Sequence, residues 1–167
     1  MTYFDSIDDD ETAFAWNLIK NATEKGYMIG ADCMDLSRKQ DDWGLPCGHA
    51  YSVLGTYSGK NKKGETINLI RVRNPWSSDA YKGPWSDDSS LWNTIDWKAA
   101  GIPYVNNTKD GDFFVQDIDF VELYAYVEIA PYSKNKQVFF TESLNDDGKK
   151  KTYDMTLEED AVINLDV

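Results

Sequence analysis

Residues 67–73 alternate between two kinds of side chain with a period of two, and this pattern constrains the fold more than any other feature of the chain. Isoleucine, leucine and two arginines occupy the odd-numbered positions, whereas asparagine, isoleucine and valine occupy the even-numbered ones. Such a period is typical of a β-strand. A strand-like run at 50–57 precedes it, and the intervening segment 58–65 carries two glycines and three lysines. The sequence therefore predicts two antiparallel strands joined by a hairpin connection.

A helix is predicted over residues 10–25. Apolar residues recur there at the i, i+3, i+4 and i+7 positions of one helical face: Ala15, Leu18, Ile19 and Ala22. Acidic residues crowd the start, where the helix dipole favours them, and Gly26 follows as a stop. Further elements are expected as strands at 27–33, 113–115 and 124–130, and as a short helical turn starting near Asp117.

A long, irregular, Trp-rich stretch occupies residues 75–111. A loop of that length inside a compact domain is usually functional or holds short elements of its own. The tryptophans are expected to pack this stretch against the sheet, since large aromatic side chains dominate small cores. A carbohydrate-binding surface is the alternative use of so many tryptophans.

Composition shifts after residue 130. Pro131 and the polar residues after it break the pattern, and new signals follow for a strand at 137–141, a turn at 145–148 and a strand at 162–167. The chain ends inside that last run. With 167 residues there is room for one domain and part of another. We therefore expect one domain over residues 1–131 and the beginning of a second, truncated one over 132–167.

Charge excludes some classes of function. The 17 Lys and Arg residues against 29 Asp and Glu residues give a net charge of −12, which argues against a nucleic-acid partner because such binding needs a basic face. This balance fits a calcium-binding protein, but it fits many acidic soluble proteins equally well. No apolar run reaches the roughly 18 residues of a transmembrane helix, and the acidic first eleven residues are unlike a signal peptide. Two cysteines make no disulfide framework, so a cytoplasmic location is expected.

The single histidine, His49, is the first candidate for chemistry. A lone histidine is most often structural, but this one starts the first strand of the hairpin, and Asn74 ends the second. Neighbouring antiparallel strands can place the two side chains side by side. A Cys-His-Asn protease needs that geometry, because the imidazole takes the thiol proton while the amide oxygen accepts the other ring N–H. Trp76 could shield that hydrogen bond from water.

Five segments together resemble consecutive motifs of the calpains, a family of papain-like cysteine proteases. They are Gly48-His-Ala-Tyr-Ser-Val53, Leu69-Ile-Arg-Val-Arg-Asn-Pro-Trp76, Gly83-Pro-Trp-Ser-Asp-Asp-Ser-Ser-Leu-Trp-Asn93, Asp110-Gly-Asp-Phe113 and Asp117-Ile-Asp-Phe120. One such segment would be a weak signal, but five in the family's order and spacing, within residues 11–130, are specific.

The resemblance implies an α+β fold, namely the antiparallel β-rich second subdomain of a papain-like protease core. From about residue 132 it implies the first strands of a C2-like β-sandwich. It assigns His49 as general base and acid, Asn74 as its orienting partner and Trp76 as their shield. The nucleophilic cysteine would lie in the first protease subdomain, in a Gly-Asp-Cys-Trp setting, and that subdomain would be this chain's partner. Limited, calcium-regulated proteolysis of protein substrates is then expected of the whole enzyme, and no peptidase activity of this chain alone.

Neither cysteine of the chain suits the role of nucleophile. Cys47 lies two residues from His49 in a strand-entry loop, where its thiol is poorly placed to face the imidazole. Cys33 ends a strand-like run with no helix after it to lower the thiol pKa. A calpain-like module that has lost proteolysis and serves protein interactions is therefore the alternative function.

An acidic cluster is the second candidate site, since calcium prefers oxygen ligands gathered from flexible loops. By resemblance, the calcium ligands are the carboxylates of Asp87, Asp110 and Asp112 and the carbonyl of Thr108. The family's glutamate ligand falls on Ala80, which removes one charged group, although Asp79 next to it could substitute. An ordinary solvated acidic surface is the alternative.

Overall fold

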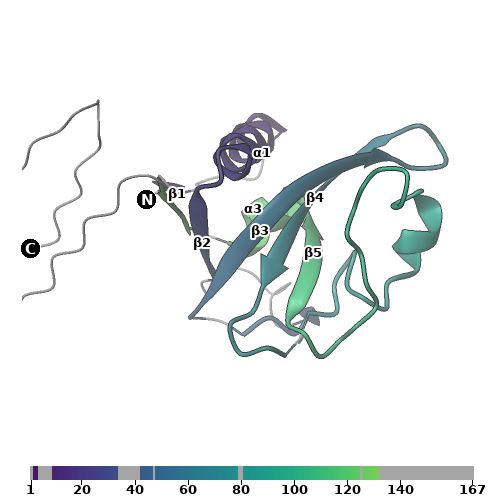
Figure 1. Ribbon diagram of the computed structural model, residues 1–167. Helices are drawn as coiled ribbons and strands as arrows, with labels where there is room; N and C mark the ends of the chain where they lie inside the picture. The colour runs from purple at the N-terminus through teal and green to yellow at the C-terminus, as the bar shows by residue number, and fades with distance from the viewer. Residues whose placement is uncertain are drawn as a thin grey trace, which may run out of the picture. The chain divides into compact units, whose positions relative to one another are not determined.

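The computed structural model describes residues 2–3, 9–33, 42–46, 48–78, 81–124 and 126–131. Figure 1 shows the arrangement of the elements. The strands are β1 (Thr2–Tyr3), β2 (Met28–Cys33), β3 (His49–Lys60), β4 (Thr66–Arg73), β5 (Asp112–Gln116) and β6 (Tyr126–Ala130). The helices are α1 (Asp9–Glu24), the 3₁₀ helix η1 (Ser90–Thr94) and α3 (Asp117–Leu123).

The six strands form one sheet in the order β1-β6-β2-β3-β4-β5, and all five pairings are antiparallel. Together with the helices packed on it, this sheet confirms the predicted α+β fold with an antiparallel sheet. β3 and β4 pair over most of their length, and the register shifts by one residue between Val53 and Gly55. Leu54 is therefore the extra residue of a β-bulge, with no partner in β4.

The hairpin connection is shorter than the predicted segment 58–65, because β3 continues to Lys60. The side-chain oxygen of Asn61 accepts the backbone N–H groups of Lys63 and Glu65, which closes the turn in five residues. Gly59 lies inside the strand rather than in the turn. A Cβ there would lie 2.6 Å from Ile95 Cδ1, so the glycine permits a close approach that the sequence does not reveal.

β4 separates two hydrophobic cores, as its alternation predicts. Ile70 and Val72 belong to the core that includes α1 and α3, whereas Leu69 belongs to the core formed with the segment 75–111 (Figure 1). Neighbouring β5 divides its phenylalanines in the same way, since Phe113 lies in the first core and Phe114 in the second. The sheet is thus covered on one face by helices and on part of the other by irregular chain.

Buried tryptophans explain how an irregular segment can cover a sheet. Trp85 and Trp92 are 2% and 4% exposed, and their rings meet edge to face at a centroid distance of 5.0 Å. Trp92 stacks on Tyr104 and also contacts Phe114 of β5. The predicted packing role is confirmed for these two tryptophans.

Most predicted boundaries differ from the structure by one or two residues. The predicted helical turn near Asp117 is the full helix α3, and the expected strand 124–130 begins only at Tyr126, because the backbone N–H of Tyr124 donates to Phe120 and caps that helix. The two-residue strand β1 is too short for any periodic signal. The strands expected at 137–141 and 162–167 lie outside the described residues, and the domain boundary at 131/132 stays a prediction.

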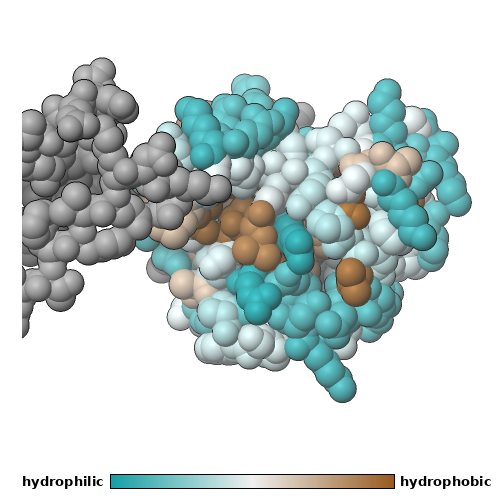
Figure 2. All heavy atoms as spheres, in the orientation of Figure 1, coloured by the Kyte–Doolittle hydropathy of each residue, from teal (hydrophilic) through white to brown (hydrophobic). Residues whose placement is uncertain are grey.

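One part of the sheet remains uncovered among the described residues. Figure 2 shows apolar atoms gathered in the region of β2 and β3, where Met28 is 60% and Leu54 is 44% exposed.

None of the described helices is long and apolar enough to span a bilayer.

Two leucines in adjacent strands test this distribution of cores. Leu69→Ala should lower the free energy of unfolding by about 2–5 kcal/mol, because it leaves a cavity in a fully buried position. Leu54→Ala, at the exposed bulge, should cost about 0.5 kcal/mol or less. Urea denaturation followed by far-UV circular dichroism measures both. Equal losses would contradict the assignment of Leu69 to a core.

Candidate active site

The hairpin brings together the two residues that the sequence marked for chemistry. His49 is the first residue of β3, and Asn74 directly follows β4, so both lie at the same end of an antiparallel pair. His49 shares its face of β3 with Tyr51 and Val53, which belong to the core under the helices. The imidazole therefore lies where that core reaches the end of the sheet.

A hydrogen bond joins the two side chains, with 2.9 Å between His49 Nε2 and Asn74 Oδ1. The orientation of the Asn74 amide is fixed independently. Its oxygen also accepts the backbone N–H of Trp76 at 3.0 Å, and its nitrogen donates to the carbonyl of Ser78 at 3.1 Å. Exchanging oxygen and nitrogen would break both of these bonds. Because an amide oxygen can only accept, Nε2 of His49 must carry the proton, and Nδ1 of the neutral ring keeps a lone pair.

Trp76 covers the imidazole. The two rings stack with centroids 3.9 Å apart and an angle of 29° between their planes. The rings of Tyr51 and His49 meet edge to face, with centroids 4.7 Å apart. Two aromatic rings therefore restrict the orientation of His49. The indole itself is 63% exposed, so one of its faces shields the histidine and much of the rest lies on the surface.

Gly111 fixes the turn that carries Asn74, and sequence reasoning missed this role. Its carbonyl accepts the backbone N–H of Asn74 at 2.8 Å, and its φ of 82° is in the left-handed region. A Cβ on this residue would lie 2.8 Å from the Asn74 carbonyl oxygen and 3.0 Å from Ser77 Cα. The glycine inside the motif 110–113 is the signal that could have indicated such a contact.

Cys33 lies directly opposite His49 in the register of β2 and β3. Residues directly opposite each other in a sheet project to the same face. The side chain of Cys33 is completely buried in the core, however, so a substrate carbonyl has no access to its sulfur. A reactive thiol lies in an electropositive, partly exposed setting, and the buried Cys33 has no such exposure. Cys47 lies outside the described residues.

Asp87 is a buried carboxylate, 2% exposed. Its Oδ2 accepts the backbone N–H of Asn107 at 2.8 Å. Burial raises the pKa of Asp87 above its ordinary value, the Asn107 hydrogen bond opposes that rise, and the negative charges of Asp110, Asp88 and Asp112 add to it. The fold thus brings Asp87 near the acids of the motif 110–113.

Asn107 links Asp87 to Asp110, because its side-chain amide also donates to Asp110 Oδ2 at 3.0 Å. The other oxygen of Asp110 accepts the backbone N–H of Asp112. Thr108 lies exposed in the turn that connects these residues. Asp87, Thr108 and Asp110, three of the four predicted ligand residues, are therefore linked through one loop, and both carboxylates already accept hydrogen bonds within the chain.

Asp112 differs from this arrangement. Its two oxygens bind separate arginines of β4, with 2.5 Å to Arg71 Nη2 and 2.7 Å to Arg73 Nη1. The carboxylate is thus neutralised by two arginines of the strand that leads into Asn74, and this competes with a role as a metal ligand. These arginine partners were not foreseen, although their alternation in β4 places them on one face.

The donor set fits a calcium ion only in part. Among the described residues, no group of three or more His, Cys, Asp or Glu side chains is arranged to hold a metal. Asp79 and Ala80, the positions where the expected glutamate is missing, lie outside the described residues. Asp87 remains as a buried carboxylate that the negative charge of Asp110 repels, and a bound cation would reduce that repulsion.

Comparison with known proteins agrees with the geometry. The sequence profile described as "Calpain family cysteine protease" matches residues 2–131. The chain is similar to the calpain-1 catalytic subunit of Bos taurus, at 36% identity over 124 residues, and to that of Homo sapiens, at 34% over 124 residues. It is also similar to the calpain-2 catalytic subunit of Mus musculus, at 33% over 119 residues.

Each of these matches covers 68% of this chain. The chain spans about one sixth of the length of these relatives, since the matches cover 16% or 17% of their sequences. A profile match over most of the described residues, together with relatives above 30% identity, is sufficient to assign the family. The chain belongs to the calpain family of cysteine proteases.

Proposed function

We propose that this chain supplies the base and the orienting residue of a cysteine endopeptidase whose nucleophile lies in a first protease subdomain outside the chain. The observation that carries this proposal is the hydrogen bond from His49 Nε2 to Asn74 Oδ1. With the amide held by Trp76 and Ser78, the imidazole is left with Nδ1 as its available base.

The chemistry follows from that tautomer. Nδ1 of His49 would take the proton of the cysteine thiol, and the thiolate would attack the carbonyl carbon of a peptide bond. The imidazolium would then return the proton to the leaving amine. In the second half, His49 would deprotonate the water that hydrolyses the thioester. Asn74 would hold the ring in one orientation through both steps, and Trp76 would keep water from their hydrogen bond.

The partner in this proposal is the cysteine-bearing first subdomain, and the substrates are proteins cut at a limited number of sites. The exposed indole of Trp76 and the half-buried imidazole offer a surface where that subdomain could dock. We also place the enzyme in the cytoplasm, because two cysteines without a disulfide framework suit a reducing compartment.

Calcium is a further part of the proposal. Asp87 and Asp110, with the carbonyl of Thr108, would hold the ion, and it would supply positive charge to a repelled pair of carboxylates. Asp112 would join them only by giving up an arginine. The expected binding is therefore weak. Gly111 gives such an ion a physical route to the active site, since it lies between two of these acids and contacts Asn74.

A non-catalytic interaction module is the second candidate. It is favoured by the complete burial of Cys33, which leaves the described residues without an accessible thiol. The fixed amide of Asn74 favours the enzyme instead, because a module freed from catalysis has no need of an oriented imidazole.

The chain by itself should not cleave a fluorogenic peptide. The reason is the absence of an accessible thiolate in the described residues, since Cys33 is buried in the core. The assay should be run with and without calcium, and with Cys33→Ala as a control for an unexpected nucleophile. Cleavage that disappears in Cys33→Ala would contradict the placement of the nucleophile in another subdomain.

Addition of the cysteine-bearing subdomain should give cleavage that depends on the two hairpin residues. His49→Ala should abolish the activity. Asn74→Ala should lower kcat by about 100-fold, a part of the 10²–10⁴-fold that a positioned base typically contributes, with a smaller change in KM. Asn68→Ala is the matched control on β4, because its amide binds Asp117 rather than His49. Parent-like rates in His49→Ala would leave the interaction module as the function.

Calcium at about 10 mM should raise the melting temperature of the chain modestly, because a weak site is still filled at that concentration. Asp110→Asn should reduce the shift. Asp87→Asn should also reduce it, while stabilising the calcium-free chain at neutral pH by removing a buried charge. Scanning calorimetry measures all three. An unchanged melting temperature of the parent in calcium would identify these acids as ordinary surface and core groups.

The pH dependence of stability provides a second readout of Asp87. Folding raises the pKa of the Asp87 carboxyl, so the folded chain binds the carboxyl proton more tightly than the unfolded chain does. The Asp87 carboxyl should therefore lower the free energy of unfolding as pH rises from the ordinary aspartate pKa through the raised pKa of the folded chain. Asp87→Asn should remove that part of the slope, and an identical slope in parent and variant would contradict the raised pKa.

A further inference from the structure

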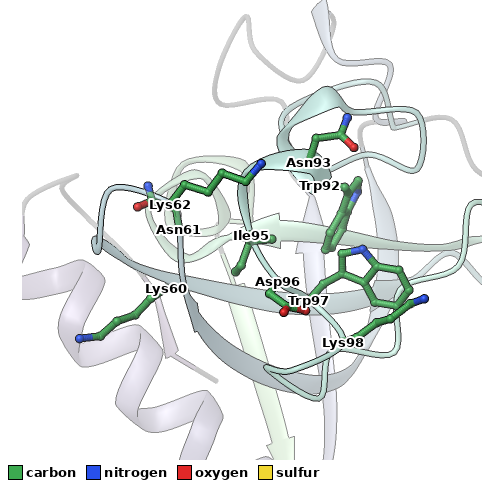
Figure 3. Close-up of a pocket in the computed structure, with 9 residues that line it drawn as sticks. All are labelled: Lys60, Asn61, Lys62, Trp92, Asn93, Ile95, Asp96, Trp97 and Lys98. Carbon is green, nitrogen blue, oxygen red and sulfur yellow. The ribbon is translucent and has the colours of Figure 1, made fainter.

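A pocket of about 510 Å³ lies at the end of the hairpin that is farthest from His49. Its walls come from the end of β3, the hairpin turn, η1 and the segment that follows η1 (Figure 3). Lys60, on its wall, is eleven residues along β3 from His49, which corresponds to about 36 Å at the usual rise of a strand. The pocket is therefore separate from the site described above.

The pocket walls are held together by backbone contacts, so the cavity is preformed. The N–H of Lys62 donates to the carbonyl of Thr94 at 2.9 Å, and Asn61 forms a β-bridge with Ile95. Gly59 lets Ile95 approach the strand, as its missing side chain leaves the required space. A ligand would thus bind without first ordering either wall.

The chemistry of the pocket combines an apolar floor with positive charge. Trp92 and Ile95 are buried below it, and Trp97 is half-buried. Figure 3 shows Lys62 extending from the hairpin toward η1, while Lys98 lies beside the ring of Trp97. The Lys98 ammonium is 5.1 Å from the centroid of that ring, within the range of a cation–π contact.

The local charge is opposite to that of the whole chain. Three lysines contribute to the pocket walls against one acid, Asp96, and the chain carries −12 overall, although Figure 3 shows the Lys60 side chain extending away from the pocket. One oxygen of Asp96 already accepts the backbone N–H of Ala99, which ties the carboxylate to its own turn. The lysine charges therefore have little internal compensation among the residues that line the pocket.

We propose that this pocket binds a short acidic peptide segment of a protein partner, with an aromatic or branched aliphatic side chain of that segment resting on Trp97. The ligand's carboxylates would pair with Lys62 and Lys98. A peptide fits better than a nucleic acid, because the strongly acidic chain repels a long polyanion beyond the immediate pocket.

The test uses the full chain and a fluorescein-labelled peptide of sequence Asp-Glu-Phe-Glu-Asp, with binding followed by fluorescence polarisation. Saturable binding is expected, and it should weaken as salt increases from about 50 mM to about 500 mM, since surface charges are screened. Lys62→Glu combined with Lys98→Glu should weaken it at least about tenfold, as two attractive pairs become repulsive. Circular dichroism checks that the variants keep their fold.

Matched controls separate the pocket from general charge effects. Lys82→Glu together with Lys25→Glu changes the net charge by the same amount outside the pocket, and it should leave binding nearly unchanged. Replacing the peptide's phenylalanine by serine should weaken binding through loss of the contact with Trp97. Equal weakening in both double variants, equal binding of the serine peptide, or tighter binding of a single-stranded oligonucleotide than of the peptide would each overturn the proposal.

Discussion

The antiparallel pairing of β3 with β4 is the constraint on which the rest of the described structure depends. It aligns the start of one strand with the end of the other, and so brings His49 and Asn74 to one end of the sheet. The alternation of β4 then divides the apolar side chains between two cores. At its opposite end, the same pairing forms one wall of the lysine-rich pocket. Both candidate sites therefore belong to a single hairpin.

At the His49 end of the hairpin, several hydrogen bonds converge on one short turn. Asn74 binds His49, Trp76 and Ser78 through its side chain, and Gly111 through its backbone. The neighbouring Asp112 forms ion pairs with Arg71 and Arg73 of the strand that leads into the turn. One carboxylate shared by two arginines forms a small network, which stabilises more than an isolated surface pair does. The acidic motif thus supports the turn that carries Asn74 whether or not a cation is bound.

Sequence reasoning predicted the parts of this structure that have a local signal. The period of β4, the helix from the spacing of Ala15 and Ile19, and the neighbouring ends that carry His49 and Asn74 all follow from such patterns. Contacts between distant segments have no such signal.

Gly59 and Gly111 illustrate this limit. In the sequence they are ordinary glycines of a turn and a loop, and only the approach of Ile95 and of the Asn74 turn explains them. The ion pairs of Asp112 were missed for a related reason. Resemblance to a metal-binding family directs attention to carboxylates, but the charges that could neutralise them internally lie about forty residues earlier.

The bulge at Leu54 has a consequence for how this chain can tolerate insertions and deletions. Before the bulge, odd-numbered residues of β3 such as Val53 face the helices; after it, even-numbered residues such as Thr56 do, and Thr56 contacts Thr23 of α1. One extra residue therefore exchanges the faces that odd-numbered and even-numbered residues of β3 occupy. Deleting Leu54 would leave Val53, Gly55 and Thr56 opposite Val72, Arg71 and Ile70, which is an ordinary ladder in which His49 keeps its face of the sheet. A single-residue deletion in the strand therefore does least harm at this position, whereas a deletion between His49 and Val53 would turn the histidine to the other face.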